Sequence, residues 1–198
     1  MALHNMEYRD KKKLSENPNT HKDLLLELAT SDNYIIIRNV AQNPNTPIDI
    51  LRKFAKDESY WIRSYVAENP NTTSVVLRKL ATDREWYVRS SVSTNINITE
   101  DLVRALAQDN KWTVRAPLAY NATTPLDILK NLATDESPDV RAMIVRNPKI
   151  SSNMLIRSLE HERSLKDPYD MVIWGLYENP KLPHVAKIII ETLYGDML

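Results

Sequence analysis

Two short amphipathic segments alternate along the chain, and each pair of segments fills a period of 26 residues. The period is marked by an asparagine that returns at this spacing, with one longer interval of 32 residues near the C-terminus. These asparagines are Asn17, Asn43, Asn69, Asn95, Asn121, Asn147 and Asn179. A fixed period of roughly 20–50 residues is typical of solenoids, in which each repeat buries its apolar face against its neighbours.

The first segment of each repeat carries leucine or valine eight residues after the asparagine, and a Leu-Ala pair often follows three residues later. The eighth positions are Leu25, Leu51, Leu77, Val103, Leu129 and Leu155. This spacing predicts a short amphipathic helix. A threonine precedes it, as at Thr46 and Thr72, and Pro47 follows the first of these. The pattern predicts that threonine caps the helix and that proline begins it, whereas Ser151 takes the cap in the sixth repeat.

The second segment begins about 17 residues after each asparagine and ends at the next one. Its apolar positions predict a second helix with one buried face. They are Ile36, Ile62, Val88, Val114 and Val140, followed by Val40, Val66, Val92, Leu118 and Ile144. Asn33, Ser59 and Ser137 are suited to cap the start of this helix. Pro117 lies inside the fourth such segment and is expected to kink or shorten it.

The repeats account for the whole length of the chain, so we expect a single all-α repeat domain. Its parts are a half-repeat cap (1–16), five repeats (17–146), a sixth repeat with an insertion (147–178) and a C-terminal capping helix (179–198). The insertion near residues 160–170 is charged and contains proline, which predicts a surface loop. Two glycines in 198 residues leave few positions for hairpins or phosphate-binding loops.

Three stretches share one pattern, LAxDxxxxVRxxVAxNPxTP: LATDREWYVRSSVSTN, FAKDESYWIRSYVAENPNT and LATDESPDVRAMIVRNP. Over about residues 17–182 the chain resembles the leucine-rich repeat variant family. The resemblance implies a HEAT-like α-solenoid, a right-handed superhelix that pairs an α-helix with a shorter, often 3₁₀, helix. It implies no single activity, because repeat scaffolds host many functions.

An acidic and a basic residue recur six positions apart in the central repeats. The pairs are Asp57/Arg63, Asp83/Arg89, Asp109/Arg115 and Asp135/Arg141. A catalytic site occurs once, whereas this pair returns in every central repeat. We therefore expect a structural ladder, in which each arginine reaches the aspartate or helix carbonyls of the next repeat. The recurring asparagines are expected to be buried amides that bond backbone groups between repeats.

Aromatic rings gather at the start of the second segment in the second, third and fourth repeats. The candidate binding strip is Tyr60, Trp61, Arg84, Trp86, Tyr87, Lys111 and Trp112. Tyr60, Trp86 and Trp112 are open to two interpretations, spacers stacked between adjacent segments or part of the strip. Trp61 and Tyr87 point away from the core, and for them we expect a role in binding. Because cations precede the rings, the strip suits an extended and partly anionic partner.

Composition and charge exclude several classes of function. The chain has 26 Lys+Arg against 26 Asp+Glu, which argues against a globally basic nucleic-acid binder. It has no cysteine, which excludes disulfides and thiolate metal sites. The four histidines (His4, His21, His161, His184) have no metal-ligand spacing, and no nucleophile–base or cofactor motif is present. We therefore expect no catalytic, cofactor-binding or metal-binding residues and no enzyme activity.

The opening MALHNMEYRDKKK lacks the apolar core of a signal peptide, and no apolar run is long enough for a membrane span. We therefore expect a cytoplasmic monomer that does not contact membranes. Its expected function is non-enzymatic binding of a protein or peptide on the surface formed by the second helices. The alternative is a nucleic-acid-binding protein similar to the HEAT-like alkylpurine DNA glycosylases, which combine a basic concave face with Trp and Asp. The zero net charge argues against this alternative.

Overall fold

The computed structural model describes residues 6–197, and all regular elements in this range are helices. Residues 6–197 form fourteen α-helices, followed by a short 3₁₀ helix, η2 (Gly195–Met197). The expected all-α class is therefore confirmed for the described residues. His4 and the rest of residues 1–5 in the expected N-terminal cap lie outside this range, as does Leu198. By their contacts the residues divide into two units, 1–102 and 103–198, which are described separately.

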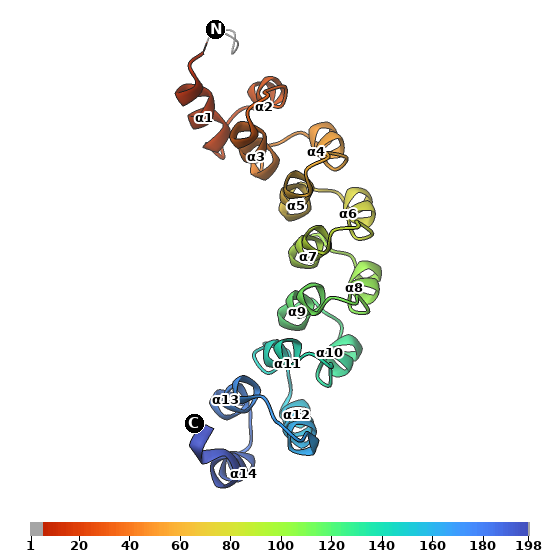
Figure 1. Ribbon diagram of the computed structural model, residues 1–198, viewed down its shortest axis with the longest axis vertical. Helices are drawn as coiled ribbons and strands as arrows, with labels where there is room; N and C mark the ends of the chain where they lie inside the picture. Colours follow the sequence, from red (N-terminus) through yellow and green to blue (C-terminus); the bar gives the residue numbers. More distant parts are fainter. Residues whose placement is uncertain (1–5, 198) are drawn as a thin grey trace. The chain divides into compact units, whose positions relative to one another are not determined.

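The helices of unit 1 form two alternating rows (Figure 1). The B row consists of α1 (Tyr8–Glu16), α3 (Tyr34–Gln42), α5 (Tyr60–Glu68) and α7 (Trp86–Thr94). The A row consists of α2 (Lys22–Leu28), α4 (Ile48–Phe54) and α6 (Ser74–Leu80), and α8 (Glu100–Leu106) crosses the boundary between units. Each B-row helix contacts the next B-row helix, and each A-row helix contacts the two B-row helices that flank it in sequence.

Unit 2 has the same alternation. Its B row consists of α9 (Trp112–Tyr120), α11 (Pro138–Ile144) and α13 (Asp170–Glu178). The other row consists of α10 (Leu126–Leu132), α12 (Ser152–Ser164) and α14 (His184–Tyr194). α9 packs on α11 and α11 on α13, while α10 contacts α9 and α11, and α13 contacts α12 and α14. Both units are therefore arrays in which helices close in sequence pack side by side.

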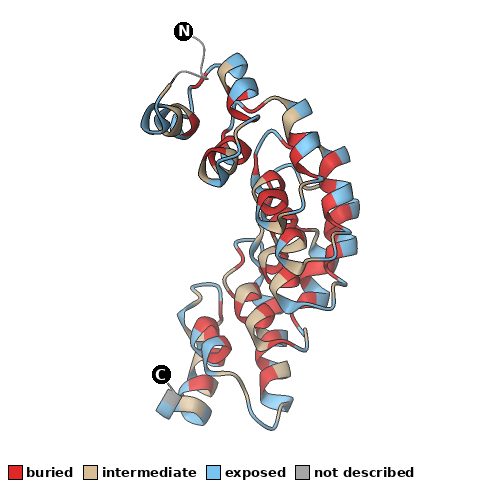
Figure 2. Ribbon diagram, turned by 45° about the horizontal axis from the view of Figure 1, so that its top comes forward, coloured by how far each residue is buried: buried red, intermediate tan, exposed pale blue. Residues whose placement is uncertain are grey.

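Buried residues lie on the helix sides that face neighbouring helices (Figure 2). In the A row of unit 1, Leu25, Leu51 and Leu77 are fully buried. In the B row, Ile62 and Val88 are at most 2% exposed. The same positions are buried in unit 2, so the predicted apolar faces of both segments are confirmed. Burial of these side chains is the main favourable contribution to folding of each unit.

The threonines that precede the A-row helices do not cap them, so that prediction was wrong. The Thr46 hydroxyl donates to the Val40 carbonyl at 2.5 Å, and Thr72 donates to Val66 in the same way. Helix α4 begins one residue later than expected, with Pro47 at its N-cap. The reason is the sharp turn after each B-row helix, because it leaves a buried C-terminal carbonyl in need of a donor. Ser151 caps α12 as predicted, accepting from the Met154 N–H.

Three further local predictions need correction. Asn33 caps α3 as predicted, but Ser59 and Ser137 stand at the N-cap positions of α5 and α11 without a side-chain capping bond. Pro117 does not shorten α9, which has nine residues like α3, α5 and α7. Val114 and Leu118 of α9 are fully buried, and their packing offsets the one backbone hydrogen bond that proline cannot make. The insertion near residues 160–170 is not a loop throughout, because α12 continues to Ser164.

Candidate binding surface

The recurring asparagine links neighbouring repeats at five positions, where its side-chain amide donates to a backbone carbonyl of the preceding repeat, as predicted: Asn43, Asn69, Asn95, Asn147 and Asn179. Asn17, which is exposed, and Asn121 instead accept from an N–H of their own turn. Asn69 Nδ2 donates to the Ala41 carbonyl at 2.7 Å and to the Asn43 carbonyl at 2.9 Å, and Oδ1 accepts from the Asn71 N–H at 2.8 Å. Asn95 repeats these contacts one repeat later. Since Asn69 is only 1% exposed, its amide serves the interior of the array and presents no group to a ligand.

Arg63 of the ladder binds two repeats at once. Arg63 Nε donates to Asp83 Oδ2 at 2.7 Å, and Nη2 donates to Asp83 Oδ1 at 2.9 Å. Arg63 Nη1 donates to two carbonyls of its own repeat, those of Asp57 at 2.8 Å and Glu58 at 3.0 Å. The two paired side chains are about nine-tenths buried, at 9% and 10% exposure. Such a bidentate pair fixes the distance and orientation between successive repeats.

The same arrangement recurs in unit 2. Arg115 pairs with Asp135 through Nε and Nη2, both at 2.7 Å, and its Nη1 donates to the Asp109 carbonyl at 2.6 Å. Arg89 of unit 1 donates to the Asp83 carbonyl of its own repeat at 2.8 Å. The geometry of Arg63 and Arg115 is that of a structural link between repeats.

Arg141 departs from the expected pattern, because its carboxylate partner is Glu162. Nε of Arg141 lies 2.5 Å from Glu162 Oε1, and Glu162 is fully buried. Glu162 also accepts from the Tyr169 N–H at 3.1 Å. The sequence pattern had placed this glutamate in a surface loop. The insertion extends α12 and moves the acidic residue to 21 positions after the arginine, where the regular repeats have 20. An acidic residue 20 or 21 positions after a ladder arginine is therefore the sequence signal that identifies Glu162.

The electrostatics of Asp83 predict an acid-sensitive contribution to stability. Burial raises the pKa of its carboxyl, but hydrogen bonds from Arg63 and the Glu85 N–H, with the Arg63 charge, hold the pKa below its usual value. A lowered folded-state pKa stabilises the fold above the unfolded value of about 4, and this contribution is lost as the pH falls through the folded value. Asp83→Asn should therefore be less stable than the wild type at pH 7, with a difference that shrinks in acid. Urea unfolding from pH 7 to pH 3 measures this, and a constant difference would contradict it.

Four of the predicted strip residues form one group of rings in unit 1. Tyr60 and Trp61 begin α5, and Trp86 and Tyr87 begin α7. The ring centroid of Tyr87 lies 5.4 Å from that of Trp61, 5.9 Å from Tyr60 and 3.6 Å from Trp86. Trp61 is 42% exposed and Tyr87 41%, while Tyr60 and Trp86 are half-buried. These residues are the four-ring cluster.

The close packing of α5 on α7 brings the rings together. Ser64 Oγ and Ser91 Oγ lie 2.6 Å apart between the two helices, and Ser91 also donates to Glu68 Oε1 at 2.8 Å. Small side chains at these positions allow the two backbones to approach. As a result, the rings at the starts of α5 and α7 touch one another across two repeats.

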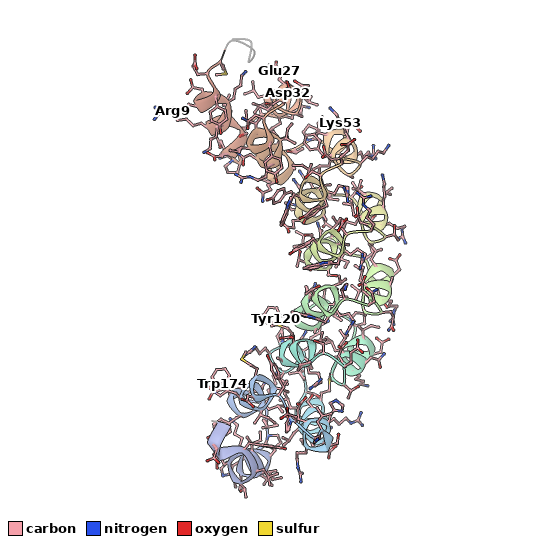
Figure 3. The ribbon with its side chains drawn as sticks, in the orientation of Figure 1. Arg9, Glu27, Asp32, Lys53, Tyr120 and Trp174 are labelled. Atoms are coloured by element: carbon pink, nitrogen blue, oxygen red, sulfur yellow. The ribbon has the colours of Figure 1, made fainter. Side chains whose placement is uncertain are left out.

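Three strip residues remain. Arg84 lies in the turn before α7, with its side chain exposed. Lys111 and Trp112 lie at the start of α9 in unit 2, where Trp112 is 45% exposed. Unit 2 also exposes rings outside the predicted strip. Trp174 of α13 is exposed and has the Arg146 guanidinium 6.0 Å from its ring centroid. Tyr120 of α9 projects to the same side of this unit (Figure 3). Trp174 was missed because it follows the insertion and lies in the middle of its helix.

Comparison with protein-family models and with curated proteins returns no match for this chain. Residues 6–197 contain no group of three or more His, Cys, Asp or Glu side chains placed to hold a metal ion. No helix in the same range has the length and apolar character needed to cross a membrane.

Proposed function

We propose that this chain is a non-enzymatic repeat scaffold that binds a protein or peptide through its B-row surface. The 26-residue sequence period supports a right-handed α-α superhelix of six two-helix repeats between half-repeat caps, as in the leucine-rich repeat variant family. In this proposal residues 1–198 are a single repeat domain with part boundaries after residues 16, 146 and 178.

The observation that carries the proposal is the exposure of the four-ring cluster. The core positions of α5 and α7 are already filled by buried aliphatic residues, such as Ile62 and Val88. Trp61 and Tyr87 therefore add little to the core, yet they place large apolar area in contact with water. Tyr and Trp at the centre of a surface patch are the residues that contribute most to binding energy at protein interfaces.

Stacked rings also suit the bases of a single-stranded nucleic acid. Phosphate recognition, however, needs cations that are free of carboxylates. Near the four-ring cluster, Arg63 is paired with Asp83, and Arg84 Nε lies 3.6 Å from Glu85 Oε1. These pairings leave no row of free cations for successive phosphates, which favours a peptide over a nucleic-acid strand.

The test is the double substitution Trp61→Ala and Tyr87→Ala in the full chain. Its probe is a peptide selected on the wild-type chain from a random 16-residue phage-display library. The variant should bind at least about tenfold more weakly, because truncation of an interface ring costs up to several kcal/mol. Its melting temperature should change little. Trp174→Ala, which removes an exposed tryptophan in unit 2, is the matched control and should leave the affinity unchanged.

Loss of stability with intact binding would assign the rings to the core and contradict the proposal. So would failure to select any peptide. Tighter binding of a single-stranded dT20 oligonucleotide than of the peptide, lost in the same variant, would favour the nucleic-acid alternative.

A further inference from the structure

A hollow lined by equivalent positions of the repeat recurs where the turn of one repeat meets the turn of the next. In unit 1 it has a volume of about 670 Å³ and is lined by Arg63, Asp83, Arg84 and their neighbours. In unit 2 it has about 370 Å³ and is lined by Arg115, Asp135, Glu136 and their neighbours. Both hollows therefore have a ladder arginine in their wall, and each hollow belongs to a single unit.

The two arginines differ in how many of their N–H groups are used. A guanidinium has five N–H donors. Arg115 directs Nη2 both to Asp135 Oδ1 and to Glu136 Oε1, the latter at 3.2 Å. Glu136 is 84% exposed, so a carboxylate reaches this guanidinium from the solvent side. In unit 1 the residue after the aspartate is Arg84, and the second Nη2–H of Arg63 has no partner among the described residues.

The charge of the unit 1 hollow also differs. Its cationic lining residues are Lys56, Arg63, Lys79 and Arg84, against Asp57, Glu58 and Asp83. The unit 2 hollow has Arg115 alone against Asp109, Asp135 and Glu136. The unit 1 hollow thus has four cationic against three anionic lining residues. An excess of one cation beside an unused arginine donor is complementary to a single carboxylate, and not to a row of phosphates. The Glu136–Arg115 contact in unit 2 is the internal example of that complementarity.

The unit 1 hollow adjoins the four-ring cluster. Glu58 and Arg84 line the hollow, while the rings of Tyr60 and Trp86 follow them by two residues. An extended chain spans at most about 3.5 Å per residue, so neighbouring residues of one peptide can reach both places.

We propose that the hollow beside Arg63 binds an aspartate or glutamate side chain of the partner peptide. Its carboxylate accepts from Arg63 Nη2, as Glu136 does from Arg115, with Lys56 and Lys79 at the rim. A neighbouring apolar or aromatic side chain of the same peptide packs on Trp61 and Tyr87. This inference rests on the proposed peptide-binding function and specifies its partner as an acidic, extended segment.

The experiment uses the full chain and the display-selected peptide. The selected sequences should carry Asp or Glu within a few residues of an aromatic or aliphatic residue. Arg84→Glu places a carboxylate where Glu136 lies in unit 2, so it should fill the Arg63 donor and weaken binding at least tenfold without lowering the melting temperature. Lys53→Glu makes the same charge change on α4 (Figure 3), at a residue that does not line the hollow. The affinity of this control for the peptide should stay within twofold of the wild-type affinity.

A second peptide with its acidic residue changed to the amide should bind the wild type about tenfold more weakly. The two peptides should bind Arg84→Glu equally, because the carboxylate then has no site left. If Trp61→Ala/Tyr87→Ala abolishes binding while Arg84→Glu and the amide peptide have no effect, this inference fails and the proposed function stands. If the library yields no binder, both fail. Binding of dT20 that is lost in Arg84→Glu would also overturn it, in favour of phosphate recognition.

Discussion

Arg63→Ala is expected to lower the free energy of unfolding by about 3–5 kcal/mol, the cost of breaking a buried ion pair by removing one partner. The variant leaves Asp83, which is 10% exposed, without its two guanidinium donors. It also leaves the carbonyls of Asp57 and Glu58 without theirs. Chemical denaturation of the purified chain, followed by circular dichroism, measures the loss.

Arg78→Ala is the matched control, because Arg78 also pairs with an aspartate of the next repeat, Asp101. Both side chains are more than half exposed in this pair, at 62% and 51%. Exposed ion pairs add little to stability, so the unfolding midpoint should scarcely move. Equal effects of the two substitutions would show that burial of the ladder pair has no energetic importance, which would contradict its role as a link between repeats.

Asn69→Ala is expected to cost about 2–4 kcal/mol, because an unsatisfied buried polar group costs roughly 1–3 kcal/mol. The substitution removes the donor to two buried carbonyls, Ala41 and Asn43, and the acceptor for the Asn71 N–H. Denaturant titration again measures the change.

Asn45→Ala is the control for this prediction. Asn45 Nδ2 also donates to a carbonyl of the preceding repeat, that of Pro18 at 2.9 Å, but the contact is exposed. Water replaces the lost donor there, so the stability should change by much less. A loss as large as that of Asn69→Ala would indicate that both amides act through the turn conformation and not through buried hydrogen bonds.

The helical architecture and the core could be predicted because each structural position is sampled once per repeat. Leu51 alone indicates little, but its equivalents recur at the same spacing and are buried in both units. The buried asparagine amides could be predicted for the same reason. A polar residue that returns at the end of the same helix in every repeat is expected to have a structural role that also returns in every repeat.

Local hydrogen bonding was less predictable. Thr46 has the residue type and position of a helix cap, but its hydroxyl bonds to the helix before it. A cap on the following helix and a bond to the preceding helix would each satisfy a backbone group at a helix end. Only the path of the turn decides which of the two forms. Glu162 was missed because the insertion shifts it by one position from the regular spacing, so it does not align with Asp83 and Asp135.

The candidate site was predicted in part. The angular position of Trp61 and Tyr87 on their helices indicated exposed rings, and both are exposed. The contact of these rings across two repeats depends on the close packing of α5 and α7, which no single segment encodes. The hollow beside Arg63 was not predicted, since it depends on which N–H groups of one guanidinium remain unused.

The most direct test of peptide binding at the four-ring cluster is to map where the selected peptide lies. A benzophenone group replaces the aromatic residue of that peptide, the complex with the full chain is irradiated, and the cross-linked residues are identified by mass spectrometry. We expect cross-links within the first turns of α5 and α7, and their loss in the Trp61→Ala/Tyr87→Ala variant. Cross-links confined to the A row or to unit 2 would contradict binding at the four-ring cluster.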